Sequence, residues 1–167
     1  AATKAQSDLI CTSSNAVRMV ESFGPDVPIV FAPDRYLGAW VSRTLGREMV
    51  LWPGSCEVHE DFSEDSIVQL RVEHPDAVVA AHPECPERVL QHADHVGSTT
   101  SILKFARDTD ARKIIVVTEA GILHQMQKEN PDKELIPAPG MDETCNCAEC
   151  PYMKKNTLEK LYLCMRD

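Results

Sequence analysis

The sequence lacks an apolar run that approaches the roughly 20 residues of a transmembrane helix, and its first residues do not follow the pattern of a signal peptide. It also lacks an excess of basic side chains: 17 lysines and arginines stand against 26 acidic residues, giving a net charge of −9. Such a balance disfavours a protein that binds nucleic acid without sequence preference. We therefore expect a cytoplasmic protein whose partners include neither a membrane nor a nucleic acid.

Two phosphate-binding motifs are also missing. Neither the G-x-G-x-x-G of dinucleotide-binding enzymes nor the G-x-x-x-x-G-K-S/T of nucleoside triphosphatases occurs. Their absence weighs against a Rossmann-like nucleotide-binding enzyme. A small anionic ligand is still compatible with the negative net charge, because free backbone N–H groups at the start of a helix attract anions.

Seven cysteines are present, and they are unevenly spread along the chain. Three of them fall within residues 145–150, shortly after Pro139-Gly140, and Cys56 follows Pro53-Gly54 in a similar way. Thiolates gathered in this manner bind soft metals or exchange electrons. A small secreted disulfide protein would be rich in loops, which this chain is not. We therefore expect reduced cysteines that are kept for a metal.

Strand-like and helix-like patterns alternate along the whole chain. Predicted strands cover residues 8–12, 28–32, 48–52, 77–81, 95–96, 113–117 and 134–138, and predicted helices cover 16–23, 35–45, 63–73, 87–92, 101–107, 121–128 and 157–165. Several strands are continuously apolar, which is typical of parallel sheets covered on both faces. The fold class is therefore predicted to be α/β, built from repeated three-layer αβα domains with parallel sheets.

The two halves of the chain resemble each other at a constant offset of 86 residues. Identical pairs are Asp8 with Asp94, Ile29 with Ile115, Val30 with Val116, Leu37 with Leu123, Glu48 with Glu134, Pro53 with Pro139, and Gly54 with Gly140. The hydroxyl-rich Thr12-Ser13-Ser14 likewise matches Ser98-Thr99-Thr100. Internal repeats of this kind indicate sister structural units with equivalent loops at equivalent ends.

The repeat divides the chain into a first αβα copy at 1–75, a second copy with the C-terminal cysteine loop at 76–156, and a terminal helix at 157–167. The strand predicted at 77–81 has a counterpart that would precede Ala1, so the first copy lacks its opening strand. If a further copy came before it, its cysteine would lie outside this sequence. Three copies around a pseudo-threefold axis would bring three cysteine loops to one point.

Three thiolates at one point suit an iron–sulfur cluster, and a 4Fe–4S cluster with three protein ligands keeps one iron open as a Lewis acid. Ser13, Ser98 and Thr99 lie at predicted helix starts. They suit the carboxylates or phosphate of a small polyanion, although helix capping is the simpler role for such hydroxyls. His59, His82 and Glu84 follow predicted strands and are candidates for proton transfer.

Five motifs together resemble those of the quinolinate synthase (NadA) family over the entire chain. They are Thr12-Ser13-Ser14-Asn15-Ala16-Val17, Pro53-Gly54 followed by Cys56-Glu57-Val58-His59, His82-Pro83-Glu84-Cys85-Pro86, Gly97-Ser98-Thr99, and Cys150-Pro151-Tyr152-Met153. The resemblance implies three similar αβα domains around a 4Fe–4S cluster. It also implies the condensation of iminoaspartate with dihydroxyacetone phosphate to quinolinate, with loss of phosphate and water, in de novo NAD biosynthesis.

Carried over by position, the resemblance assigns roles to eight residues. Cys56 and Cys150 match cluster ligands, and the third cluster cysteine lies before Ala1. The substrate-binding residues are Ser13, Ser98, Thr99, His82 and Glu84, and the catalytic ones are Glu84, His82 and His59. The implied partners are the missing N-terminal domain of the same enzyme and L-aspartate oxidase as a supplier of iminoaspartate. We expect this segment to be inactive alone.

An alternative of another class is a non-catalytic α/β module that binds zinc or an iron–sulfur cluster. Cys145 and Cys147 leave this alternative open, because they are suited to a structural zinc knot or a redox pair. Cys11, Cys85 and Cys164 are interpreted as packing residues. For Asp34 and Glu119, which follow strands in the two copies, a place in the lining of the site is the less favoured of two interpretations.

Overall fold

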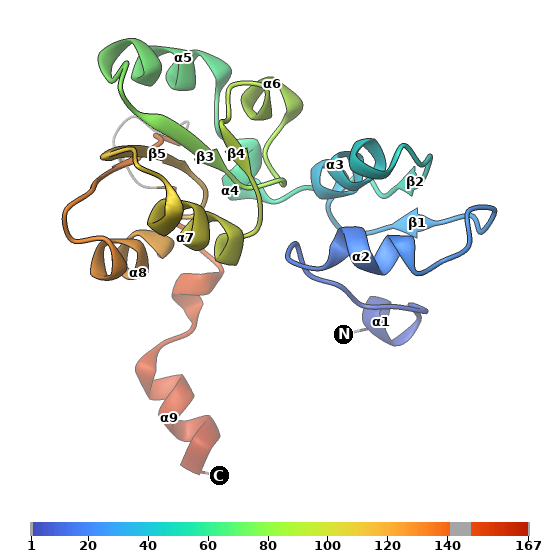
Figure 1. Ribbon diagram of the computed structural model, residues 1–167. Helices are drawn as coiled ribbons and strands as arrows, with labels where there is room; N and C mark the ends of the chain where they lie inside the picture. The colour runs from blue at the N-terminus through green and yellow to red at the C-terminus, as the bar shows by residue number, and fades with distance from the viewer. Residues whose placement is uncertain (1, 141–147, 167) are drawn as a thin grey trace.

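The computed structural model describes residues 2–140 and 148–166, which form two parallel sheets flanked by helices (Figure 1). This is the predicted α/β fold. The helices are α1 Ala2–Ala5, α2 Ala16–Glu21, α3 Arg35–Leu45, α4 Glu57–Glu60, α5 Glu64–Glu73, α6 Glu87–Leu90, α7 Thr99–Asp108, α8 Ile122–Glu129 and α9 Leu158–Arg166, with a 3₁₀ turn, η1, at Met153–Lys155. The strands are β1 Val30–Phe31, β2 Val50–Leu51, β3 Val78–Ala81, β4 His95–Val96, β5 Lys113–Val117 and β6 Glu134–Pro137.

The first unit is a two-stranded sheet, β1 beside β2, that packs against α2 and α3. Its helix α3 has strong local signals at both ends. The carboxylate of Asp34 accepts the backbone N–H of Leu37 at the N-terminus, and Gly46 ends the helix with a φ of 61°. A left-handed backbone of this kind favours glycine. Both ends of α3 agree with the sequence-based prediction.

One face of this small sheet is covered and the other is bare. Phe31 lies in a cluster with Val20, Leu37 and Val41, whereas Val30 on the opposite face is 71% exposed. A side chain as exposed as Val30 gains no stabilising free energy from packing against other described residues. Among the described residues, helices therefore cover only one face of this first sheet.

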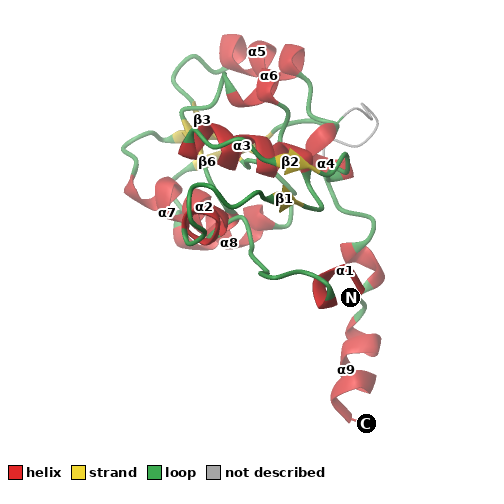
Figure 2. Ribbon diagram, turned by 90° about the vertical axis from the view of Figure 1, so that its right-hand side faces the viewer, coloured by secondary structure: helices red, strands yellow, loops and turns green. Residues whose placement is uncertain are grey.

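The second unit has four parallel strands in the order β4-β3-β5-β6. Successive residues of β5 alternate between two cores. Ile115 and Val117 pack on the face that α5 and α6 cover, and Ile114 and Val116 pack on the face that α7 and α8 cover. Figure 2 shows these helix pairs on opposite sides of the strands. Each such fully buried side chain contributes roughly 1.5–3 kcal/mol, which makes this three-layer unit the stable part of the chain.

The segment that joins the two sheets packs with the second one. Val58 and Phe62, at and after α4, and Ile67 of α5 belong to the same buried cluster as Val79 and Ile115. A domain boundary between residues 75 and 76 therefore separates the two copies of the sequence repeat, but residues on both sides of it belong to the same hydrophobic core. In the first half of the sequence, helix α4 itself is an addition to the predicted elements.

The predicted repeat is visible in the order of elements. Helices α2 and α3 with strands β1 and β2 correspond to α7 and α8 with β5 and β6 at the offset found in the sequence. The strand predicted at 8–12 is wrong, because these residues have irregular backbone and all but Cys11 are exposed. Its counterpart β4 pairs with β3, and no described strand lies beside 8–12 to supply such a partner.

The C-terminal residues 151–166 extend away from both units (Figure 1) and are exposed throughout. Leu158 is 85% exposed and Met165 79%. Across residues 2–140 and 148–166, we find no helix with the length and apolar character needed to cross a membrane.

Candidate functional site

Side chains from both units meet where β3 and β5 end. His82 and Glu84 follow β3, Thr118 follows β5, and α4 brings His59 and Cys56 against them. Parallel strands place their carboxyl ends at one edge of the sheet, where α/β proteins commonly bind ligands. The sequence predicted that these strand ends would carry the chemistry.

The loop that carries Cys56 is held by a buried carboxylate. Asp34 Oδ2 accepts the backbone N–H of Cys56 at 2.8 Å, and Oδ1 accepts that of Leu37 at 2.7 Å. Asp34 is only 5% exposed, and this burial raises its pKa above the ordinary value, partly offset by the hydrogen bonds it accepts. Glu60, at the end of α4, accepts from Arg35 and Ser55, which fixes the same loop from its other side.

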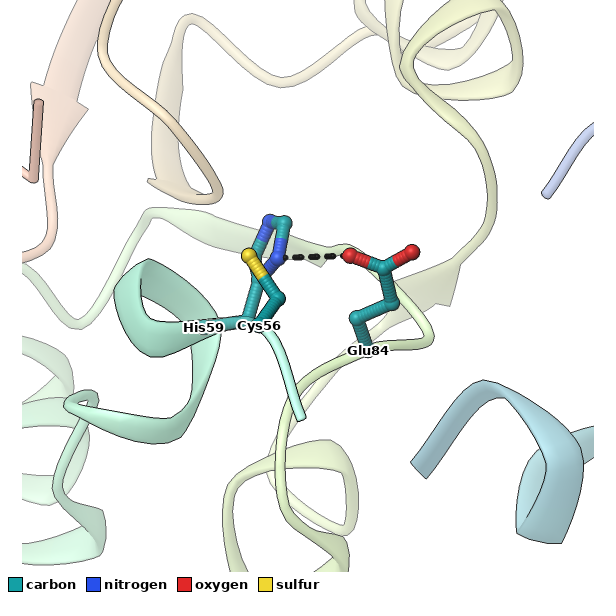
Figure 3. Close-up of side chains that lie close together, drawn as sticks. All are labelled: Cys56, His59 and Glu84. Carbon is teal, nitrogen blue, oxygen red and sulfur yellow. Dashed lines mark ion pairs between the residues drawn. The ribbon is translucent and has the colours of Figure 1, made fainter. Parts of the chain in front are cut away.

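Cys56, His59 and Glu84 form a compact group of possible metal ligands. The Cys56 Sγ, one His59 ring nitrogen and one Glu84 oxygen all lie within 4.8 Å of one another. Figure 3 shows that Cys56 and His59 come from the start and body of α4, with Glu84 facing them from the loop after β3. His59 Nδ1 is 3.0 Å from Glu84 Oε2. This contact is an ion pair, because Nδ1 has no partner in hydrogen-bond geometry.

His59 is held by its other nitrogen. Its Nε2 is 2.9 Å from Thr118 Oγ1, and both residues are buried. Thr118 was missed in the sequence, although its place directly after the apolar run of β5 is a signal that could have identified it. With Nε2 occupied in this way, the ring turns Nδ1 toward Cys56 and Glu84.

The two buried histidines differ in protonation: at neutral pH the ring of His59 is charged and that of His82 is neutral. Burial alone would lower the pKa of His59, but its interactions with Cys56 and Glu84 outweigh this effect and raise the pKa to about 9. For His82, burial and repulsion from His59 lower the pKa to about 4. Burial would raise the pKa of Glu84, yet its interactions with His59 and His82 bring the pKa below the usual value. At neutral pH the site holds an imidazolium, an imidazole and a carboxylate.

His82 links this group to the first unit. Its ring stacks on that of His59, with centroids 4.5 Å apart and planes 15° apart. Its Nδ1 accepts the backbone N–H of Glu84 at 3.3 Å, so its Nε2 carries the hydrogen and donates to Ser13 Oγ at 3.1 Å. The structure thus brings Ser13, a predicted substrate-binding residue, to the predicted catalytic group.

Ser98 and Thr99 lie at the start of α7 instead. Ser98 Oγ accepts the backbone N–H of Ser101 at 3.3 Å, so Ser98 caps the helix, which is the simpler of its two predicted roles. Thr99 is the first residue of α7 and is exposed. Within the described ranges, no hydrogen bond joins either hydroxyl to His59, His82 or Glu84.

Cys150 repeats the backbone arrangement of Cys56. Its N–H donates to Glu119 Oε1 at 3.3 Å, while Glu119 Oε2 accepts the N–H of Gly121 at 2.8 Å. Cys56 and Cys150 are both half-buried free thiols that pack against the same apolar cluster. A role of Asp34 and Glu119 in lining the site was the less favoured interpretation of the sequence. In the structure each carboxylate accepts one backbone N–H of a cysteine loop and one at the start of the helix that follows it.

The remaining cysteines divide into three cases. Cys85 is fully buried, and burial raises the pKa of its thiol, in agreement with a packing role. Cys11 is half-buried. Cys164 is exposed on α9, so its predicted packing role is wrong for the part of the chain that the structure describes. Cys145 and Cys147, and with them the zinc knot or redox pair, lie outside the described residues.

Comparisons with known proteins place the chain in a family. The family model described as "Quinolinate synthetase A protein" matches residues 1–167. The quinolinate synthase of Thermosynechococcus vestitus is 61% identical over 164 residues, which are 98% of this chain and 51% of that protein. That of Trichodesmium erythraeum is 54% identical over 167 residues, 100% of this chain and 51% of its own length.

A third relative shows the same coverage. The quinolinate synthase of Chloroherpeton thalassium is 54% identical over 164 residues, 98% of this chain and 51% of that protein. The chain therefore spans about half the length of the curated relatives it matches. With its α/β fold, its full-length family match and these identities, the chain belongs to the quinolinate synthetase A protein family.

Proposed function

We propose that this chain is the second and third αβα domains of a quinolinate synthase. The whole enzyme condenses iminoaspartate with dihydroxyacetone phosphate and releases phosphate and water to give quinolinate for NAD biosynthesis. The observation that supports the proposal most is the meeting of Ser13, Cys56, His59, His82 and Glu84 at the strand ends of the second sheet. In the sequence these residues lie in separate motifs up to 71 positions apart.

A 4Fe–4S cluster is the proposed cofactor, held by Cys56, Cys150 and a third cysteine that would precede Ala1. The donor set fits in two respects. Both thiols are free and only half-buried, and both loops are fixed by carboxylates that bind the backbone rather than the sulfur. When bound, such a cluster supplies an open iron that acts as a Lewis acid toward a substrate oxygen.

Glu84 is the proposed proton acceptor. Its carboxylate is charged at neutral pH, because the lowered pKa leaves it ionised, and the ion pair with His59 fixes its orientation. His59 thereby acts beside Glu84 as a charge partner that Thr118 orients. A carboxylate held in this way can take a proton from substrate during the loss of water.

His82 and Ser13 form the proposed substrate-binding pair. Neutral His82 presents Nε2–H to Ser13 Oγ, and a substrate oxygen can take the place of either partner. Ser98 and Thr99 would add hydroxyl groups, and the N–H groups at the start of α7 would attract a carboxylate or phosphate. These residues would anchor the two polyanionic substrates.

The proposal also covers the protein partners of this chain and its location in the cell. The domain that supplies the third cysteine is the essential partner, and L-aspartate oxidase would supply the unstable iminoaspartate. A cytoplasmic location would keep the thiols of Cys56 and Cys150 reduced. Without its partner domain, the segment would form no quinolinate.

Anaerobic iron and sulfide analysis tests the proposal on two proteins, the present chain and the same chain preceded by the missing part. About four irons and four sulfides per protein are expected only for the longer one. Exchange of Cys56 or Cys150 for serine should remove the cluster, while Cys164→Ser on exposed α9 should leave it intact. A full cluster in the longer protein with Cys56→Ser would contradict the proposal.

A further inference from the structure

We infer that Cys56, His59 and Glu84 also form a binding site for a single Zn²⁺ ion. Cys56 is the only residue that this site would share with the proposed cluster, so the two occupants exclude each other. The zinc site is complete within the present chain and does not depend on the proposed function. Its ligands come from α4 and from the loop after β3 (Figure 3).

The separations of the donor atoms suit a tetrahedral ion. Bonds of about 2.3 Å to sulfur and about 2.0–2.2 Å to nitrogen and oxygen place neighbouring ligand atoms roughly 3.3–3.6 Å apart. The three donors already lie within 4.8 Å of one another, and His59 Nδ1 is 3.0 Å from Glu84 Oε2. Donor atoms that lie up to 4.8 Å apart would have to close by about 1 Å, which rotation of the partly exposed Glu84 side chain can supply.

The buried nitrogen of His59 faces the other two ligands. His59 is 6% exposed, and its Nδ1 lies 3.0 Å from Glu84 Oε2 but has no partner in hydrogen-bond geometry among the described residues. A buried polar atom is normally satisfied, because burying it without a partner costs free energy. A metal ion between Cys56 and Glu84 would displace the proton of this nitrogen and bind its lone pair.

The surroundings of His59 are also those of a metal ligand. A metal-bound histidine usually donates its second N–H to a neighbouring oxygen, which fixes the ring and the tautomer. Here Nε2 lies 2.9 Å from Thr118 Oγ1, and Thr118 is 3% exposed. The contact leaves Nδ1 as the nitrogen that faces the other two ligands.

The ligand types select zinc among common divalent ions. Thiolate and imidazole are preferred by zinc, whereas magnesium and calcium prefer sets made of oxygen alone. Three protein ligands leave a fourth position, as in zinc sites that keep a bound water. The Glu84 side chain is 23% exposed, so solvent can reach that position.

Zinc titration of the metal-depleted, reduced chain under anaerobic conditions tests the site. The chain competes with a chromophoric chelator for Zn²⁺ alone, and Co²⁺ serves as the spectroscopic probe. We expect the Cys145→Ser/Cys147→Ser double variant, in which the rival cysteine loop is removed, to bind one Zn²⁺. Its Co²⁺ form should show thiolate-to-metal charge transfer and the strong visible bands of a tetrahedral ion.

Three further exchanges are made in that background. Glu84→Gln keeps the size of a partly exposed side chain and should weaken zinc binding by about 100-fold or more, since loss of a direct ligand exceeds the 10–100-fold effect of an outer partner. Cys56→Ser should do the same and abolish the charge-transfer band. His92→Gln is the matched control, because His92 pairs with Glu64 at 2.9 Å on the surface without a thiol.

The outcomes separate the possibilities. Circular dichroism of each variant establishes that the fold is kept, and Glu84→Gln is the exchange least able to disturb it. Zinc that is unaffected by both Glu84→Gln and Cys56→Ser, or that disappears with Cys145 and Cys147, would overturn the inference. Failure of the zinc site would leave iron binding by the longer protein untouched, because the cluster requires neither His59 nor Glu84 as a ligand.

Discussion

The carboxylate of Asp34 accepts the backbone N–H of Cys56 at 2.8 Å, although the two residues are 22 positions apart. Glu119 accepts the backbone N–H of Cys150 across 31 positions in the second unit. Each carboxylate uses its other oxygen for an N–H of the helix that follows it. In both copies of the repeat, a carboxylate thus connects the backbone of a cysteine loop to the start of the helix that follows the carboxylate.

Asp34→Asn should destabilise the chain by about 1–3 kcal/mol. The exchange places an amide where the buried carboxylate accepts from both Cys56 and Leu37, so one N–H loses its acceptor. Urea denaturation measures the change. Asp108→Asn, on an exposed residue beside Arg107, should alter stability by less than about 0.5 kcal/mol. Equal effects of the two exchanges would refute this role for Asp34.

Substitution by alanine should have different effects on stability at two glycines that occupy equivalent positions in the repeat. A Cβ at Gly54 would lie 2.6 Å from the carbonyl oxygen of Pro33, whereas a Cβ at Gly140 would meet no atom of the described residues within 4 Å. Gly54→Ala should therefore displace the Cys56 loop at a cost of about 1–3 kcal/mol and weaken zinc binding. Gly140→Ala should be close to neutral in both measurements.

Phe62→Ala should cost about 3–5 kcal/mol, because Phe62 is 1% exposed and joins the segment after α4 to the second core. The ring also lies 6.3 Å from that of His59, so its loss should loosen the site. Chemical denaturation measures stability, and Co²⁺ spectra report on the site. Val72→Ala on α5 is the control, since Val72 is 76% exposed. A loss below about 1 kcal/mol for Phe62→Ala would contradict the described packing.

The stability of the metal-free chain should be greatest near pH 6.5. The pKa of His59 rises from 6.5 to about 9 on folding, so its contribution is complete below pH 6.5 and is lost as pH rises to about 9. The pKa of His82 falls from 6.5 to about 4, so stability decreases as pH falls from about 6.5 to about 4. Denaturation at a series of pH values measures both limbs.

Two variants test which residue causes the loss of stability in each pH range. Glu84→Gln removes the carboxylate that helps to keep His59 charged, so it should flatten the alkaline limb. His82→Gln should flatten the acidic limb, and His124→Gln on the surface should change neither. An acidic limb that survives in His82→Gln would assign the effect to another group.

Local signals account for what the sequence predicted well. The ends of α3 follow from Asp34 and Gly46, and β5 follows from a continuous apolar run with a charged first residue. The meeting of His59, His82 and Glu84 was predictable because each follows a predicted strand. The eight site residues stay functional predictions, but the structure brings five of them together at one sheet edge.

Other features depend on contacts with distant partners, and those contacts were not predictable even where the position of the residue was a signal. Residues 8–12 have a strand-like composition, but a β-strand requires a neighbour for its N–H and C=O groups, and the described chain provides none there. Thr118 and the backbone contacts of Glu119 matter because of what lies opposite them in space. No pattern in the sequence alone specifies such contacts across 31 or 59 positions.

The position of Cys56 between the two units has a mechanical consequence. Its backbone is fastened to Asp34 of the first unit, while the next turn of helix is anchored by Val58 and His59 in the core of the second. The sulfur of Cys56 is therefore held between the two units, beside other contacts such as that of Ser13 with His82. An ion bound to Cys56, His59 and Glu84 would add a direct link between the loop tied to the first unit and the core of the second.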